Sequence, residues 1–274
     1  MSNRTRDADR SSGRGPRVRG LVELGLAIVV LAGCGPGLPT PSTRQAHHAA
    51  TLWKFALAAA AAVGLVTMGF ILWTAFRYRR RDDALPNQRN SHLVLEVVCT
   101  VIPVVIVAGL FAFTLGTERR MTRVSDDPDL VVDVVAFQWG WTFTYRDKGV
   151  VSASPEAGEP AVLALPVGST VRLNLHAADV IHSFWVPQFL EKRDVIPRFD
   201  NTIDVNVTRE GEWTGRCAEF CGLDHWEMNF DVKALSPANF QRWLDDERAH
   251  PPPTTSVTAP VSPGTALGTG TTTP

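Results

Sequence analysis

Twelve residues near the C-terminal end of the chain gather four side chains that bind soft metals. The segment 217–228 reads Cys-Ala-Glu-Phe-Cys-Gly-Leu-Asp-His-Trp-Glu-Met, so two thiols, an imidazole and a thioether share one short loop. Sulfur and imidazole ligands select copper over hard cations, and a thioether beside them is typical of copper electron-transfer sites. A mononuclear site of that type uses one cysteine. The pair four residues apart therefore suggests sulfurs that bridge two metal ions.

The same cysteine pair is open to two other interpretations, a disulfide or half of a zinc knuckle. Neither explains Met228 or the upstream His182. We expect His182 at the end of a strand, where sheet packing holds its ring toward the cysteine loop, and Asp179 is placed to orient the imidazole. His176 is expected at the surface or beside the ligands.

The elements that must position these ligands are β-strands within 124–250. Short β-branched runs bounded by Gly, Pro or Asp occur at 131–137, 161–165, 170–175 and 201–207. This pattern is typical of a sandwich or barrel, and we predict a β-sandwich. Ser236 and Pro237 form a helix start, and Phe240, Trp243 and Leu244 share one face of the helix that follows, which closes the domain.

Two longer apolar runs precede the sandwich, at 52–76 and 93–115. Each is long enough to cross a hydrocarbon core of about 30 Å, so both are expected to span a membrane. The basic connector 77–81 lies between them, and the positive-inside rule places it in the cytoplasm, with the C-terminal domain exported. The alternative is a buried helical hairpin of a soluble protein. Cys99, in the second run, is expected to be a buried, inert thiol.

The two ends of the chain have different compositions. Residues 1–20 contain six arginines and two aspartates, and an apolar run then leads to Leu-Ala-Gly-Cys at 31–34. We interpret 1–33 as a signal peptide with a bacterial lipobox, which makes Cys34 the lipidated first residue of the mature chain; an ordinary signal peptide cut nearby is the alternative. Residues 251–274 lack large apolar side chains and are predicted to be a disordered tail.

Together, the lipobox, the two apolar spans and the cysteine loop resemble subunit II of a haem-copper cytochrome c oxidase, over residues 51–249. The resemblance implies an N-terminal two-helix transmembrane hairpin followed by an all-β, cupredoxin-like sandwich with a dinuclear copper A centre. Six ligands are implied. Two cysteines bridge the coppers, each histidine holds one copper, the methionine binds weakly and a glutamate contributes its backbone carbonyl: Cys217, Cys221, His182, His225, Met228 and Glu219.

The resemblance also implies roles for residues outside the ligand set. The Glu219 carboxylate would help bind magnesium or manganese at the boundary with subunit I, and Glu96 would stand at the mouth of a proton-uptake channel. Trp139 would be the entry point for electrons from cytochrome c. It begins an alternating run in which Trp141, Phe143 and Tyr145 share one face of the same strand as packing or contact residues. The family often has an aromatic residue at the position of Gly140, so this chain departs from the pattern there.

Charge supports a basic protein partner. Residues 124–250 contain 21 acidic and 11 basic residues, a net charge of −10. Such an excess attracts a basic cytochrome c over long range, and salt weakens the attraction. The simpler explanation of the same count is solubility.

The expected function is that of an electron-input subunit in a proton-pumping oxidase of the bacterial cell membrane. Subunits I and III and cytochrome c are its expected partners, haem belongs to the partner subunit, and nucleic acid is not among the partners. Three rivals differ in testable features. A quinol oxidase subunit lacks the copper ligands, nitrous oxide reductase has a tryptophan in place of Glu219 and an added propeller domain, and a copper chaperone needs neither Trp139 nor two spans.

Overall fold

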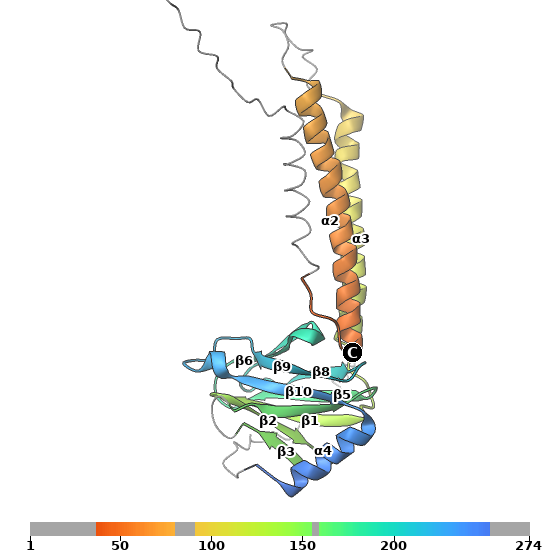
Figure 1. Ribbon diagram of the computed structural model, residues 1–274. Coiled ribbons are helices and arrows are strands. Elements are labelled where there is room, and N and C mark those ends of the chain that lie inside the picture. The colour runs from red at the N-terminus through yellow and green to blue at the C-terminus, as the bar shows by residue number, and fades with distance from the viewer. Residues whose placement is uncertain (1–36, 80–90, 155–158, 253–274) are drawn as a thin grey trace, which may run out of the picture. The chain divides into compact units, whose positions relative to one another are not determined.

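The computed structural model describes residues 37–79, 91–154 and 159–252 (Figure 1). The predicted signal peptide, Cys34, all but the first two residues of the predicted tail and the last two residues of the basic connector, 80 and 81, lie outside these ranges. The described residues form a pair of long helices and a β-sandwich closed by a C-terminal helix.

The two long helices are α2 (Arg44–Arg77) and α3 (Leu93–Met121), and both are long and apolar enough to cross a membrane. They contain the predicted spans 52–76 and 93–115 and contact each other side by side, for example through the rings of Phe55 and Phe113, whose centroids are 5.1 Å apart. Helix α2 begins after Thr43, whose hydroxyl accepts the Ala46 N–H at 2.9 Å. Such caps satisfy N–H groups that have no partner within the helix.

The start of α3 uses two side chains. The His92 ring accepts the Leu95 N–H at 3.3 Å, and the Glu96 carboxylate accepts the His92 N–H at 3.0 Å. This reciprocal arrangement resembles a capping box and gives Glu96 a structural task at the helix end. The expectation for Cys99 was wrong, because its thiol is exposed on the surface of α3. Two helices packed side by side cover few of each other's side chains. A cysteine within the apolar run 93–115 can therefore be exposed in the single chain.

The sandwich consists of two five-stranded sheets, with strand orders β3-β2-β1-β5-β8 and β4-β10-β9-β6-β7. The pairs β1–β5 and β4–β10 are parallel and the other pairs are antiparallel. The fold is therefore the expected two-helix hairpin followed by a cupredoxin-like β-sandwich. The strands are β1 (Leu130–Phe137), β2 (Gly140–Tyr145), β3 (Val150–Ala153), β4 (Ala161–Pro166), β5 (Thr170–Ala177), β6 (His182–Val186), β7 (Glu191–Val195), β8 (Asn201–Asn206), β9 (Gly211–Cys217) and β10 (Asn229–Leu235).

An aromatic cluster fills the core between the sheets. Trp141, Phe143 and Tyr145 on β2 are fully buried, and the Trp141 and Phe143 rings lie 5.1 and 5.4 Å from the ring of Phe230 on β10. Gly215 on β9 makes room for this ring, because a Cβ there would lie 2.1 Å from Phe230. Aromatic rings in edge-to-face contact stabilise such a core beyond the area they bury.

Trp139 is not part of strand β2, which corrects the expectation of one continuous aromatic strand. It lies in the turn between β1 and β2, and the strand begins at Gly140. A side chain at position 140 would collide with its neighbours, because a Cβ there would lie 2.8 Å from the Phe137 ring and 2.9 Å from the Ser154 Cβ. The departure from the family pattern at Gly140 therefore has a local steric reason.

Helix α4 (Pro237–Ala249) closes the domain, with Ser236 as its cap accepting the Asn239 N–H at 3.4 Å. The apolar face of α4 packs against Tyr145, the last residue of β2. The Tyr145 ring lies 6.2 Å from Phe240 and 5.2 Å from Trp243.

A polar cluster ties the segment after α3 and the start of α2 to the edge strand β8. The Asp204 carboxylate accepts two bonds from the Arg172 guanidinium, at 2.9 and 3.0 Å, and one from the Ser125 N–H at 2.5 Å. The Gln45 amide donates to the Asp204 carbonyl at 2.8 Å and accepts the Asn206 N–H at 3.3 Å. We call these residues, Gln45, Ser125, Arg172, Asp204 and Asn206, the linker network.

Candidate metal centre

The cysteine loop connects the ends of two paired strands. Cys217 is the last residue of β9, Met228 immediately precedes β10, and the Cys217 N–H donates to the Met228 carbonyl at 2.9 Å. The loop between them contains one turn of 3-10 helix, η2 (His225–Glu227). Because antiparallel pairing holds both ends, all the loop ligands are presented at one end of the sandwich.

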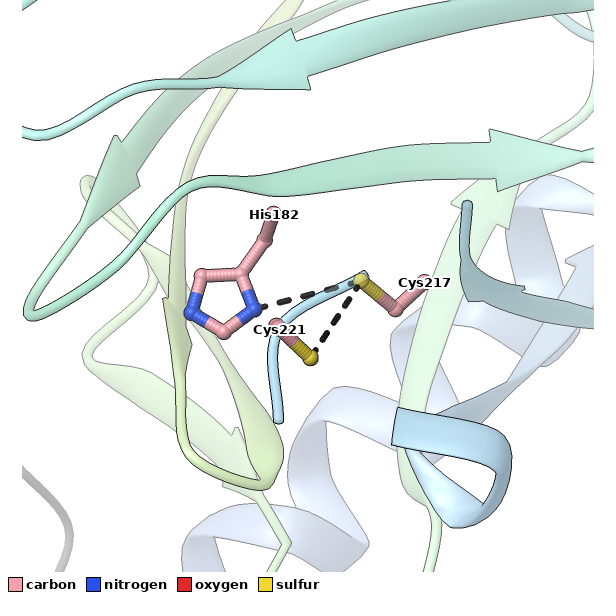
Figure 2. A group of neighbouring side chains, drawn as sticks. All are labelled: His182, Cys217 and Cys221. Atoms are coloured by element: carbon pink, nitrogen blue, oxygen red, sulfur yellow. Dashed lines mark hydrogen bonds between the residues drawn. The ribbon is translucent and has the colours of Figure 1, made fainter. Parts of the chain in front are cut away.

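Figure 2 shows three side chains that converge at this end, His182, Cys217 and Cys221. All three are buried, and their ligand atoms lie within 4.8 Å of one another. The two sulfurs are 3.9 Å apart and the Cys217 sulfur is 3.9 Å from the His182 Nδ1. A disulfide would need about 2.05 Å, whereas two sulfurs on one tetrahedral ion with bonds of about 2.3 Å stand about 3.8 Å apart. The geometry therefore favours a metal over a disulfide.

The other three predicted ligands adjoin the same sulfurs. The Cys221 sulfur lies 3.4 Å from the His225 Nδ1 and 3.7 Å from the Met228 thioether. The Cys217 sulfur lies 3.2 Å from the Glu219 carbonyl oxygen. The structure thus brings all six predicted ligand groups into one cluster, and this donor set fits copper.

His182 is oriented by a carboxylate. As the first residue of β6 it is fully buried, and its Nε2 lies 2.8 Å from the Asp179 carboxylate, which leaves Nδ1 facing Cys217. Asp179 is itself held by the Val180 N–H at 2.7 Å and the Gln138 N–H at 2.8 Å. A carboxylate on the remote nitrogen sets the ring orientation and tautomer of a metal-binding histidine.

The pKa values of the two thiols are shifted in opposite directions. Burial raises the pKa of Cys217, but the hydrogen bond with His182, the backbone contacts with Glu219 and Ser183 and the charge of His182 together outweigh burial, and the pKa falls to about 7. Burial together with the negative charge of Cys217 raises the pKa of Cys221 to about 12. The metal-free protein therefore favours one thiolate over two. A bound cation would stabilise both, so the pair fits a metal that binds two thiolates.

Some singled-out side chains lie outside the cluster. The Glu219 carboxylate is about half exposed and lies 3.9 Å from the Lys192 ammonium, away from the sulfurs that its carbonyl contacts. The His176 ring pairs with Asp200 at 3.0 Å and lies outside the cluster that the described residues form.

Trp139 contacts the metal loop directly, because its indole N–H donates to the Cys221 carbonyl at 3.3 Å. The residue before it, Gln138, donates to the same carbonyl at 2.6 Å and was not singled out from the sequence. Its only signal was its position next to Trp139, and no spacing rule connects it to a cysteine 83 residues later.

The surface around the loop is apolar. The exposed fractions of three side chains from the loop are high, at 78% for Phe220, 81% for Leu223 and 73% for Trp226. Exposed apolar clusters of this kind mark interaction surfaces more often than isolated apolar residues do.

Two family models match the chain. The cytochrome c oxidase subunit II transmembrane domain matches residues 32–115, and the periplasmic domain of the same subunit matches residues 156–235. A solved periplasmic domain of subunit II of cytochrome oxidase from Bradyrhizobium japonicum aligns with 46% of this chain and 98% of its own, at 27% identity and a TM-score of 0.43.

Full-length relatives are also similar. The probable cytochrome c oxidase subunit 2 of Streptomyces coelicolor is 36% identical over 286 residues, which cover 87% of this chain and 90% of the relative. Cytochrome c oxidase subunit 2 of Mycobacterium bovis is 33% identical over 303 residues, 85% of this chain and 84% of the relative. With two membrane-spanning helices and a C-terminal domain of the periplasmic type, the chain belongs to the cytochrome c oxidase subunit II family.

Proposed function

We propose that this chain is the electron-input subunit of a proton-pumping terminal oxidase, with a dinuclear copper A centre at the cysteine loop. The observation that carries the proposal is the cluster of six ligand groups around two free sulfurs 3.9 Å apart. Electrons enter from cytochrome c and leave for the haems of subunit I, where oxygen is reduced to water. When bound, the copper pair supplies reversible one-electron transfer.

Each ligand residue has a distinct task in the proposed centre. Cys217 and Cys221 would both hold the copper pair, and His182 and His225 would each supply an imidazole to it. Met228 is a weak ligand, and Glu219 contributes its carbonyl. Five of these groups lie in the segment 217–228, whose ends are held by the β9–β10 pairing, and His182 lies on the neighbouring strand β6. Ligands held by a sheet change their positions little between oxidation states, which lowers the reorganisation that accompanies electron transfer.

Trp139 is proposed as the entry point for electrons. Its indole is half-buried against the core and donates to the carbonyl of Cys221, so a short bonded path leads from the ring to a bridging sulfur. The apolar side chains Phe220, Leu223 and Trp226 surround the loop, and the net charge of −10 over 124–250 favours a basic cytochrome c.

Subunits I and III are the proposed membrane partners of α2 and α3, whose apolar surfaces are exposed in the single chain. The exposed Glu219 carboxylate is available for a magnesium or manganese ion shared with subunit I, because hard cations prefer carboxylate oxygens.

Two further roles are proposed from the resemblance. Glu96 is placed at the start of α3, where the proton-uptake entrance is expected, although its carboxylate is bonded to the His92 N–H in the isolated chain. Cys34 is proposed as the lipid-bearing residue of the mature chain in a bacterial cell membrane, with the sandwich on the outer face.

The test is to purify the full chain in detergent, load it with copper and record its electron paramagnetic resonance spectrum. A seven-line hyperfine pattern, from one unpaired electron shared by two copper nuclei, supports the proposal. A four-line pattern would mean a single copper and would exclude the dinuclear centre. Failure to bind copper would exclude the electron-input role altogether.

A further inference from the structure

Two separate segments supply the ligands of the proposed centre, and Gln138 contacts both. His182 is held through Asp179, which precedes β6, whereas Cys221 lies in the β9–β10 loop. Gln138 lies in the β1–β2 turn. Its backbone N–H donates to the Asp179 carboxylate at 2.8 Å, and its side-chain amide donates to the Cys221 carbonyl at 2.6 Å.

These contacts form a continuous chain of hydrogen bonds across the centre. It runs from the His182 ring to Asp179 at 2.8 Å, then to Gln138, and ends at the Cys221 carbonyl. The two carboxylate oxygens of Asp179 make separate contacts: Oδ1 contacts the His182 imidazole, and Oδ2 accepts the Gln138 N–H. One residue of a third segment thereby sets the distance between an imidazole and a thiol that are 39 residues apart in sequence.

The cysteine loop is shaped to accept this contact. Gly222 follows Cys221 and has φ +123°, a conformation that side chains disfavour. A Cβ at this position would lie 2.9 Å from the Gln138 amide nitrogen and 3.1 Å from the Trp139 ring. The glycine lets the loop lie directly against both donors.

The two donors to the Cys221 carbonyl are not equivalent. The Gln138 bond is 2.6 Å long and the Trp139 bond is 3.3 Å long, beyond the usual range for N–H···O bonds. The position of the carbonyl therefore depends more on the amide than on the indole. The two residues therefore have different roles. Gln138 holds the loop, whereas electron entry is the role proposed for Trp139.

We propose that Gln138 is a positioning residue that ties the imidazole side of the metal centre to its thiolate side. The inference rests on the proposed function for the identity of the metal, but its contacts exist in the metal-free chain. A residue that fixes the spacing between ligands from two segments maintains the metal geometry, as outer partners of ligands do in other metal sites.

The test is Gln138→Leu in the full chain, because leucine keeps a similar size and the backbone N–H but removes the amide donor. We expect copper to be lost about 10- to 100-fold faster and the hyperfine spectrum to change. Gln241→Leu is the matched control. Gln241 lies on α4, where its exposed amide donates to Asp245 at 3.0 Å, and its loss should change neither quantity.

A second readout needs no copper. In the metal-free chain, Cys221 is 4% exposed, and its alkylation rate, followed by fragmentation mass spectrometry that separates it from Cys217 and Cys99, reports on the loop. Gln138→Leu should accelerate alkylation of Cys221, and Gly222→Ala, which pushes on the same contact from the other side, should do so as well.

The outcomes separate the two proposals. If the unaltered chain shows the seven-line spectrum and Gln138→Leu retains it with unchanged copper loss and alkylation, the positioning role is excluded while the proposed function stands. If the unaltered chain binds no copper, the proposed function fails, and the alkylation rates still decide whether Gln138 holds the loop.

Discussion

The linker network and the metal centre are both polar clusters that join distant segments, but only the first balances its own charges. In the linker network, the nearly buried Asp204 carboxylate meets the Arg172 guanidinium through two hydrogen bonds. In the metal centre, the contacts of the two cysteine sulfurs are with imidazole, thioether and carbonyl groups, and the pKa values of the thiols diverge.

The difference separates a structural task from a functional one. A cluster with matched charges holds the fold without a ligand, and removing one partner leaves a costly unpaired group. A cluster in which the pKa of one thiol is raised beside the other thiol is suited to a cation that stabilises both thiolates. The first should therefore control the stability of the metal-free chain, and the second should control metal binding.

The largest expected effect is on the metal centre. Cys221→Ser removes a proposed bridging sulfur, so copper affinity should fall by more than about 100-fold, beyond what loss of an outer hydrogen bond causes. The seven-line spectrum should disappear, as recorded on the full chain in detergent. Cys99→Ser alters an exposed thiol on α3 and should leave the spectrum unchanged. A seven-line spectrum in Cys221→Ser would refute the bridging role.

Asp204→Ala should produce the next effect and act on stability. It leaves Arg172 and the Ser125 N–H without their shared acceptor, so the free energy of unfolding of the metal-free chain should fall by about 2 to 3 kcal/mol. Tryptophan fluorescence in denaturant measures this. In Asp245→Ala the lost partner of Arg248 is an exposed group, and the change should stay below about 0.5 kcal/mol. Equal effects of the two variants would contradict the comparison.

Trp139→Phe should separate electron entry from ligand geometry. Cytochrome c oxidation by the assembled oxidase should slow about tenfold or more, which corresponds to about 1.4 kcal/mol in the barrier. The copper spectrum should persist, because Gln138 still donates to the Cys221 carbonyl. Trp243→Phe changes a ring of α4 that packs against Tyr145 and should leave turnover unchanged. Normal turnover of Trp139→Phe would remove the indole from the electron path.

The smallest expected effect comes from a turn next to the metal loop. Arg198 has φ +62° and follows Pro197 in a turn closed by the Phe199 N–H donating to the Ile196 carbonyl at 3.1 Å. A left-handed conformation at this position suits glycine. Arg198→Gly should raise the free energy of unfolding by about 0.5 kcal/mol, because relief of strain exceeds the added freedom of the unfolded chain.

Arg198→Ala is the matched control for this turn. Alanine keeps the Cβ and hence the strain, so thermal unfolding should show no gain. A gain of the same size in both variants would mean that the arginine charge, rather than the backbone conformation, sets the stability of the turn.

Sequence patterns predicted the parts of the molecule that depend on local properties. Apolar runs of sufficient length identified both long helices, the alternation of Trp141, Phe143 and Tyr145 indicated one buried face, and Ser236 with Pro237 indicated the start of α4. The six donor groups that the structure brings together were also expected, because five of them fall within one twelve-residue segment whose resemblance to a known family added His182 and the role of Glu219.

Sequence patterns did not predict features that depend on contacts between distant segments. The need for glycine at position 140 depends on the space that Phe137 and Ser154 occupy around it. The exposure of Cys99 depends on how little surface a two-helix hairpin covers. Each of these outcomes is set by neighbours in space.

The sequence by itself determined which atoms are available to a metal and that apolar helices precede a β-sandwich, since ligand chemistry and hydrophobic periodicity reside in single residues and short segments. Only the tertiary structure decided how the ligands are held. Gln138 reaches a carbonyl 83 residues away and Arg172 reaches a carboxylate 32 residues away because sheet pairing brings their strands and loops together. Hydrogen bonds need atoms within about 3 Å, and that proximity is a property of the folded chain.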